Sequence, residues 1–344
     1  MYKVNMNSHH SALALIFAEL FILALQFFGV TILDLVAPLI SDVDYYFIVL
    51  VITQVAILVA ALAAVVIARR EGPARFKDFA PSRTSLSQAG RLALSAIGLL
   101  FFSLPFTSLF SELLINLGVS APSSPLTFAN SYEFFWGLIL VCALPAVVEE
   151  FTVRGAIMNG LLKVGVLPAI FLSAFIFAIM HGNPYQLVHQ FLLGAVMAYV
   201  VIVSGNLLSS FIMHFTNNAI ALVASSLTYF AQNSPNGNLS TSTAGPLEYV
   251  ILFVLSALGA WLFVVQIKRW TQGAIISEVS RHPDKRSIYV RWCDSKGLFG
   301  YVSALGKWRL EVWNKQEKLS PTIYLAIGLA LFILGLNTYS LVIM

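Results

Sequence analysis

Residues 134–163 read FFWGLILVCALPAVVEEFTVRGAIMNGLLK, an apolar run that contains two adjacent glutamates and an arginine. The charged residues near its centre are Glu149, Glu150 and Arg154. A helix that crosses a bilayer needs about 20 mostly apolar residues, so this run is long enough. Ionisable side chains are costly inside a membrane and usually mark a functional site. The stretch therefore predicts a membrane helix that carries a polar site.

The composition of the whole chain indicates a membrane protein with many spans. The chain has 344 residues, of which 58% are hydrophobic and 10% charged, and its mean hydropathy is +0.83. A soluble domain carries about 25% charged residues. We therefore predict an all-α polytopic bundle of about nine transmembrane helices. The apolar runs are 12–38, 45–68, 92–117, 134–163, 166–186, 187–204, 206–228, 247–267 and 321–343.

The distribution of basic residues predicts the orientation of the bundle. Seventeen of the twenty Lys and Arg residues lie in segments 69–91 and 268–320, and the loops 118–133 and 229–246 contain none. Basic loops stay in the cytoplasm. Six predicted spans separate the two basic segments, which is the even number that this sidedness requires. We expect a prokaryotic multi-pass protein of the cell membrane, with the N-terminus cytoplasmic and the C-terminus outside. This placement of the basic residues also argues against nucleic acid as a partner.

We divide the chain into four regions: two spans with a basic loop (1–91), a membrane core (92–267), a cytoplasmic insert (268–320) and a last span (321–344). The insert contains three strand-like stretches, 287–293, 298–303 and 307–313, and is either a small β-rich unit on the membrane surface or a charged linker that fixes topology. The two cysteines, Cys142 and Cys293, form no CxxC pair, which makes a disulfide or a thiolate metal site improbable.

Three pairs of polar or aromatic residues recur at a spacing of four in these runs. Glu150 and Arg154 share one helical face, whereas Glu149 is rotated by about 100° and points elsewhere. Two carboxylates in different environments can take different chemical roles. Phe177 precedes His181 by four residues, so the phenyl ring is expected to stack beside the imidazole and fix its orientation. His214 and Asn218 form the third pair. Each pair alone has a structural explanation, such as a solvated helix end or a hydrogen bond between helices.

Taken together and in this order, the three motifs resemble the CPBP family of intramembrane proteases, also called the ABI family, which includes CAAX prenyl endopeptidases and bacteriocin-processing enzymes. That family carries Glu-Glu-x-x-x-Arg, Phe-x-x-x-His and His-x-x-x-Asn on successive core helices. The resemblance covers about residues 92–228. One position departs from it, because the residue before the arginine is often aromatic and here is Val153; this change is expected to affect packing more than chemistry.

The resemblance implies an endopeptidase that hydrolyses a peptide bond with a glutamate-activated water and no cofactor. Glu149 would be the general base and His181 would orient the water or the substrate. His214 and Asn218 would stabilise the oxyanion, and Glu150 with Arg154 would form a supporting pair beside Phe177. The implied partners are the lipid bilayer and a peptide or membrane-protein substrate. The predicted spans place His214 about 12 Å from the cytoplasmic face and His181 nearer the outer face, so a cavity, kinked helices or other boundaries must bring them together.

Three other hypotheses remain open. Two histidines and a glutamate are a known catalytic zinc ligand set, although no HExxH motif occurs. A catalytically silent scaffold that binds partner proteins would keep the same fold. A transporter would use buried polar residues along an ion path, for which Glu19, Asp34, Glu112 and His189 are candidates. His189 and its neighbour Gln190 can instead be packing residues or lie at the mouth of the cavity.

Overall fold

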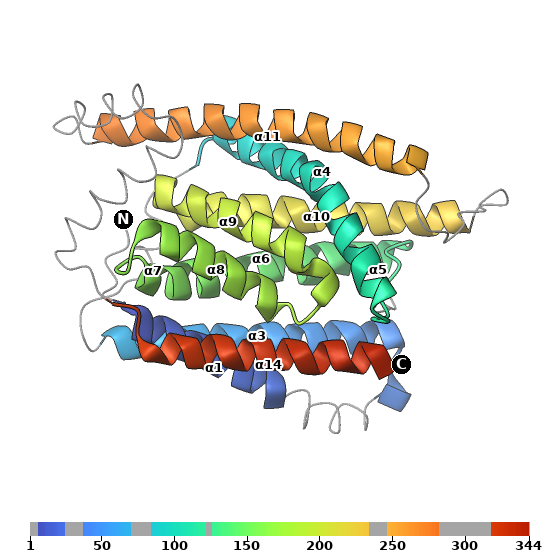
Figure 1. Ribbon diagram of the computed structural model, residues 1–344, viewed down its shortest axis with the longest axis horizontal. Coiled ribbons are helices and arrows are strands. Elements are labelled where there is room, and N and C mark those ends of the chain that lie inside the picture. The colour runs from blue at the N-terminus through green and yellow to red at the C-terminus, as the bar shows by residue number, and fades with distance from the viewer. Residues whose placement is uncertain are drawn as a thin grey trace.

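The computed structural model describes residues 6–24, 37–69, 84–121, 126–233, 246–281 and 318–343, and these segments form a bundle of nearly parallel helices (Figure 1). The described residues contain no strand. The helices are α1 (Ser8–Ala24), η2 (Ala37–Leu39), α3 (Asp42–Arg69), α4 (Leu86–Asn116), α5 (Ser131–Trp136), η4 (Gly137–Ala143), α6 (Leu144–Glu150), η5 (Phe151–Ile157), α7 (Met158–Leu161), α8 (Val166–Met180), η6 (Pro184–Gln186), α9 (Leu187–Ser204), α10 (Leu207–Gln232), α11 (Pro246–Arg281) and α14 (Pro321–Ile343).

Seven helical segments in the described part of the chain are long and apolar enough to cross a membrane. The two shorter apolar helices are α1 and α8, with 17 and 15 residues. The all-helical membrane fold is therefore confirmed, whereas the predicted count of nine spans is not. Residues 166–186 were predicted as one span, but α8 ends at Met180, and Gly182 with a positive φ of 60° begins a turn into η6. Residues 25–36, which include Asp34, lie outside the described residues.

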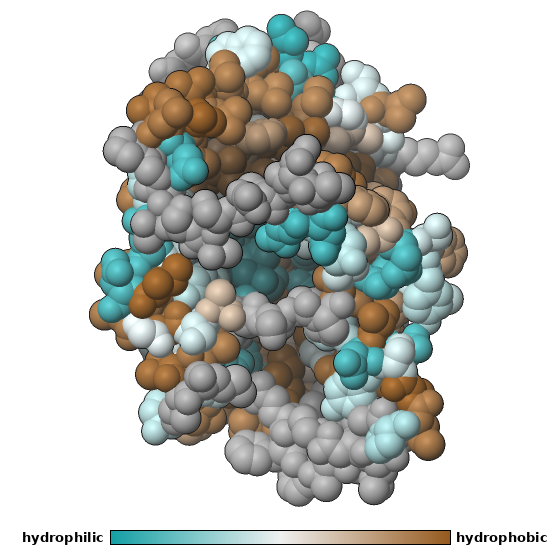
Figure 2. All heavy atoms as spheres, turned by 90° about the vertical axis from the view of Figure 1, so that its right-hand side faces the viewer, coloured by the Kyte–Doolittle hydropathy of each residue, from teal (hydrophilic) through white to brown (hydrophobic). Residues whose placement is uncertain are grey.

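The helix directions agree with the predicted sidedness of the basic loops. In Figure 1, α3 ends and α4 begins at the left of the bundle, and α11 ends and α14 begins at the same side. The parts of the basic segments that connect these helix ends are residues 70–85 and 282–320. The loops without Lys or Arg connect helix ends at the right. Hydrophilic side chains gather at that right-hand end, where Figure 2 shows a recess at the centre with hydrophilic residues inside it.

The apolar run 134–163 forms one continuous helical stretch with two π-helical segments. These segments, η4 and η5, flank the α-helical turns of α6. Pro145 lies inside this continuous stretch, in the first turn after η4, so its missing N–H falls within the helix. Residues 131–161 form a single helical segment that is long and apolar enough to cross a membrane. π-Helical turns are frequent at functional sites, and here they lie on both sides of the two glutamates.

Helix α11 extends further than the sequence predicted. It continues through residues 268–281, which were predicted to begin the cytoplasmic insert. Residues 267–274 of this helix pack on the bundle, because Trp270 is buried and the hydroxyl groups of Tyr199 and Thr271 lie 2.8 Å apart. The side chain of Trp270 lies among apolar neighbours, which explains why the helix does not end at the first basic residue. The three predicted strands lie outside the described residues.

Small residues set the closest helix contacts. A Cβ added to Gly259 of α11 would lie 2.6 Å from Cβ of Phe101 and 2.7 Å from the carbonyl oxygen of Gly98 in α4. A Cβ on Gly160 of α7 would lie 2.1 Å from the hydroxyl of Ser11, which donates a hydrogen bond of 2.7 Å to the carbonyl of Ile157. Membrane helices approach closely through such small residues. Helix α1 is thereby fixed against the helical stretch that carries the glutamates.

Candidate active site

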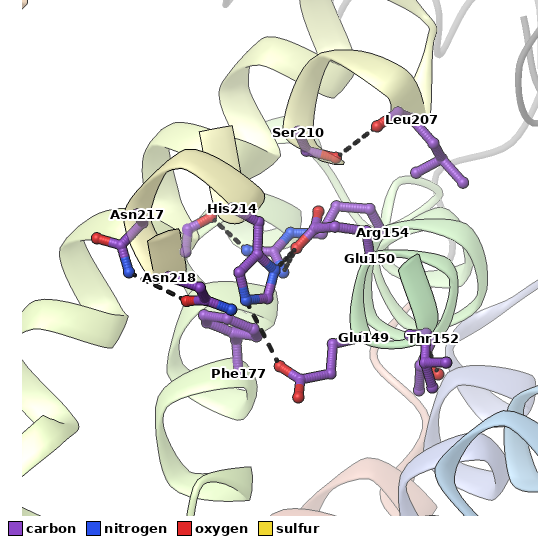
Figure 3. Close-up of polar contacts among 12 residues, drawn as sticks. Glu149, Glu150, Thr152, Arg154, Phe177, Leu207, Ser210, His214, Asn217 and Asn218 are labelled. Carbon is purple, nitrogen blue, oxygen red and sulfur yellow. Dashed lines mark hydrogen bonds and ion pairs between the residues drawn. The ribbon is translucent and has the colours of Figure 1, made fainter. Parts of the chain in front are cut away.

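The two adjacent glutamates at the end of α6 point into different surroundings, as Figure 3 shows. The side chain of Glu150 is 2% exposed and faces α9 and α10, whereas that of Glu149 is 15% exposed and lines a cavity of about 360 Å³. This divergence agrees with the predicted rotation of about 100° between neighbouring helical residues. Only Glu149 is placed to meet a substrate or water in the cavity.

Glu150 and Arg154 form a fully buried ion pair. Arg154 Nη1 donates to Glu150 Oε1 at 2.8 Å, and Arg154 Nη2 donates to the carbonyl oxygen of Gly194 at 3.0 Å. The guanidinium carbon also lies 4.4 Å from the centroid of the Phe177 ring. These contacts join α6, α8 and α9 around one positive charge. The predicted i, i+4 pair is therefore present, and it organises the interior instead of facing the cavity.

His181 is the C-cap of α8 and is held by the last turn of that helix. Its Nδ1 lies 2.7 Å from the carbonyl oxygen of Phe177. Because a carbonyl can only accept, Nδ1 carries the proton, and Nε2 of the neutral ring is an acceptor. This Nε2 faces the cavity, 3.9 Å from Glu149 Oε2. The Phe177 ring meets His181 edge-on, with centroids 4.7 Å apart and planes at 77°, so the contact is confirmed but the expected stacking is not.

His214 lies between the two glutamates. Its Nδ1 is 3.1 Å from Glu150 Oε1, and its Nε2 is 3.9 Å from Glu149 Oε2. Glu150 Oε1 already accepts from Arg154, so Nδ1 of His214 is the donor in this contact. The Phe177 ring packs edge-on against this imidazole as well, at a centroid distance of 5.5 Å. One phenyl ring thus contacts both histidines and the arginine.

Asn218 lies one turn after His214 on the same face of α10 and contacts the π-helical segment η4. Its Nδ2 donates to the carbonyl oxygen of Val141 at 3.3 Å. Pro145 has no N–H to give to this carbonyl four residues earlier, so Asn218 supplies a donor there. In Figure 3 the amide nitrogen of Asn218 lies on the side that faces the His214 ring. The carboxamide has two N–H groups, and the second is available to the site.

Gln54 is a site residue that the sequence did not reveal. It stands in α3, and its Nε2 donates to Glu149 Oε1 at 3.0 Å. This bond fixes the rotation of the carboxylate and leaves Oε2 toward the two histidines. In the sequence, Gln54 is one polar residue in an apolar span with no motif around it. Its side chain is 4% exposed, which is typical of a residue held for a specific contact.

Much of the cavity wall comes from helices outside the motifs. Residues of α1, α3 and α14, among them Glu19, Thr53 and Asn337, line it together with the motif helices. Glu19 is 2% exposed, and its Oε1 has no hydrogen-bond partner among the described residues. Its carboxyl group therefore adds a second acidic side chain to the cavity. Asp34 lies outside the described residues, and Glu112, His189 and Gln190 do not line this cavity.

The predicted difference in depth between the histidines disappears in the structure. Helix α8 has 15 residues and rises about 22 Å at 1.5 Å per residue. It therefore ends within the bundle, and His181 at its C-cap lies level with His214, which follows seven residues after the start of α10. Both Nε2 atoms reach the same oxygen of Glu149. The predicted span boundaries caused the conflict in depth.

The family comparison agrees with the resemblance that the motifs indicate. Residues 131–220 match the family model of the type II CAAX prenyl endopeptidase Rce1-like proteins. This segment carries all seven motif residues, from Glu149 to Asn218, and it confirms the resemblance to the CPBP family. The match supports a membrane-embedded peptidase of the CAAX type. Neither the curated proteins nor the solved structures gave a significant match.

Proposed function

We propose that the protein is an intramembrane endopeptidase in which Glu149 activates a water molecule to cleave a peptide bond. One observation carries this proposal: Nε2 of His181 and Nε2 of His214 both lie 3.9 Å from Glu149 Oε2, and Glu149 and His181 line a cavity of about 360 Å³, with His214 directly behind them. Both separations are too long for a direct hydrogen bond. One water molecule can contact Glu149 Oε2 and a histidine at the same time across such a distance.

The geometry gives this water a defined orientation. Neutral His181 presents a lone pair on Nε2, so it accepts one hydrogen of the water, and Glu149 Oε2 accepts the other. The lone pairs of the water oxygen are then directed away from both groups and toward the carbonyl carbon of a substrate in the cavity. As the water attacks, its proton passes to Glu149. A positioned general base of this kind contributes about 10²–10⁴-fold in rate.

His214 and Asn218 are placed to bind the negative oxygen of the tetrahedral intermediate. The proposal places a proton on both ring nitrogens of His214, so that Nδ1–H donates to Glu150 and Nε2–H faces Glu149 and the site. The second N–H of Asn218 is the other donor. Donors fixed before the reaction stabilise developing charge most strongly where water is scarce.

Cleavage ends when the proton held by Glu149 is transferred to the leaving amine. The oxyanion carbonyl then re-forms, the peptide C–N bond breaks, and the carboxyl and amine products leave the cavity. Glu150, Arg154 and Phe177 do not touch the reacting atoms in this scheme. They hold His214 and His181 at their positions, which is why the buried ion pair lies directly behind the histidines.

The substrate is a peptide or membrane-protein segment that reaches the cavity within the bilayer. The cavity wall is formed mostly by apolar residues of α1, α3, α8 and α14, which suits a segment taken from lipid. Glu19 Oε1 is buried without a partner, and such a group is costly unless a ligand supplies a donor. We propose that Glu19 accepts an N–H group of the substrate.

We also propose that the reaction needs no metal. A zinc-dependent reaction is the second candidate, because Nε2 of the two histidines and the carboxylate of Glu149 form a possible ligand set. Within the described ranges, however, no group of three His, Cys, Asp or Glu residues is arranged to hold a metal ion. If purified protein loses activity with a strong chelator and regains it with zinc, the metal-dependent reaction replaces the one proposed here.

A proteomic comparison tests the function and identifies a substrate. Membranes that contain wild-type protein are compared with membranes that contain Glu149→Ala, and peptides ending at new cleavage sites are sought. The expected result is at least one membrane protein or peptide whose cleavage requires Glu149. A synthetic segment spanning that cleavage site then serves as the reporter peptide for purified variants. If no cleavage depends on Glu149, the protein is a scaffold and the proposed function is wrong.

A further inference from the structure

A chain of hydrogen-bonded side chains crosses three helices and ends at Asn218. The hydroxyl of Ser103 in α4 lies 2.8 Å from Nδ1 of His189 in α9. His189 Nε2 lies 2.8 Å from Asn217 Oδ1 in α10. Asn217 Nδ2 donates to Asn218 Oδ1 at 3.3 Å. None of the first three residues belongs to the motifs, and none lines the cavity.

From His189 to Asn218, the donors and acceptors of the chain have one consistent direction. Asn217 Oδ1 is an acceptor, so His189 donates from Nε2. Nδ1 of neutral His189 is then an acceptor for the Ser103 hydroxyl, which also lies 2.8 Å from the carbonyl oxygen of Leu100 and has one proton for these two acceptors. Because Asn217 Oδ1 is occupied by His189, its Nδ2 faces Asn218 and must meet the oxygen of that amide. Each group therefore fixes the orientation of the next one.

The sequence of donors and acceptors along this chain determines which end of the Asn218 carboxamide faces the active site. Its oxygen is bound by Asn217, and one of its two N–H groups is bound by the Val141 carbonyl. Figure 3 shows Asn217 on the side of Asn218 opposite to the glutamates. If the amide turned by 180°, its oxygen would face the Val141 carbonyl, and two N–H groups would face each other at Asn217. The network thus holds a donor, and not an acceptor, toward the site.

Burial restricts the replacement of a lost hydrogen-bond partner by water. Ser103 is 1% exposed and Asn217 is 4% exposed, whereas His189 and Asn218 are half-buried, so the restriction is strongest at Asn217. A buried polar group without a partner costs about 1–3 kcal/mol. An amide that is free to turn would spend part of its time with the oxygen toward the oxyanion, where it repels negative charge.

We propose that His189 and Asn217 are positioning residues of the peptidase, which hold the Asn218 carboxamide as an oxyanion donor. The inference rests on the proposed function and extends it to helices α4 and α9. His189 and Asn217 touch neither substrate nor water in this account. They act on turnover because the oxyanion exists only in the transition state and its tetrahedral intermediate.

A double-mutant cycle on purified protein and the reporter peptide tests this inference. His189→Leu removes the donor to Asn217, and His189→Gln keeps a donor of similar reach. We expect His189→Leu to lower kcat by about 10- to 100-fold, less than the 10²–10³-fold of a lost oxyanion donor, with KM changed less than twofold. His189→Gln should recover most of the loss. In an Asn218→Ala background, His189→Leu should have no further effect, because groups that act as a unit are not additive.

A second variant covers the case in which His189→Leu does not fold. Asn217→Asp has nearly the same shape, but a carboxylate can only accept, so it favours the turned amide of Asn218. We expect a loss of kcat for Asn217→Asp in the wild-type background and none in the Asn218→Ala background. Retained thermal unfolding temperatures in detergent show that each variant is folded.

The outcomes separate this inference from the proposed function. If His189→Leu and Asn217→Asp act equally in both backgrounds, or change KM alone, the chain is a packing contact between helices and the inference is wrong. The inference is also wrong if Glu149→Gln is inactive while His189→Leu and Asn217→Asp both cleave at the wild-type rate. If Glu149→Gln cleaves normally, the proposed function itself fails.

Discussion

Replacing Gln54 with methionine tests whether the orientation of the Glu149 carboxylate matters. Methionine has a similar length and volume, but it cannot donate a hydrogen bond. The variant therefore loses the 3.0 Å bond from Nε2 to Glu149 Oε1. A hydrogen bond to a charged group contributes about 1.5–3 kcal/mol. Each 1.36 kcal/mol in the activation barrier changes a rate tenfold, so the full loss corresponds to a decrease of about 10- to 150-fold in kcat.

The assay is steady-state cleavage of the reporter peptide by purified protein in detergent or vesicles. Gln190→Met is the matched control, because Gln190 is also a buried glutamine but does not line the cavity, and its Oε1 has no hydrogen-bond partner among the described residues. We expect Gln190→Met to keep kcat within about twofold. A Gln54→Met variant that folds and cleaves as fast as wild type would refute the argument that Gln54 holds the base in its reactive orientation.

Two further predictions concern packing and topology. Gly259→Ala should lower the stability of the protein in detergent by about 1–3 kcal/mol, the usual cost of overpacking, because its Cβ would meet the backbone of α4. Gly328→Ala is the control, since nothing lies within 4 Å of a Cβ at that position of α14, and equal thermal unfolding of the two variants would contradict the packing. The variant Asn233→Cys, at the end of α10, should react with a membrane-impermeant thiol reagent on intact cells, because this loop is predicted to lie outside. Cys293 is predicted to be cytoplasmic and should not react. Labelling of Cys293 would overturn the predicted orientation.

Much of the fold could be predicted because apolar length and charge placement act locally along the chain. The helical character of every described run was predicted in this way. The predicted run 166–186 was too long, because His181, Gly182, Asn183 and Pro184 follow Met180 and the helix ends at this turn. The extension of α11 also escaped prediction, since burial of Trp270 outweighs the basic residues before it.

Part of the candidate site could likewise be predicted from the sequence, and part of it could not. The motif spacing placed Glu150 with Arg154 and Phe177 beside His181, and the structure contains both contacts. Gln54 could not be predicted, because its partner is 95 residues away and no local pattern connects them. The polar chain to Asn218 also depends on helix packing. Asn217 is adjacent to Asn218 in sequence, but helical geometry turns it by about 100° toward α9.

The central claim is that the Glu149 carboxylate is the base, and one measurement tests it most directly. Purified Glu149→Gln is compared with wild type on the reporter peptide, with Glu112→Gln as a control that makes the same chemical change in α4, outside the cavity. We predict a decrease in kcat of at least about 10²–10⁴-fold for Glu149→Gln, with normal folding and no comparable loss for the control. Cleavage by Glu149→Gln at a rate close to that of wild type would contradict the account.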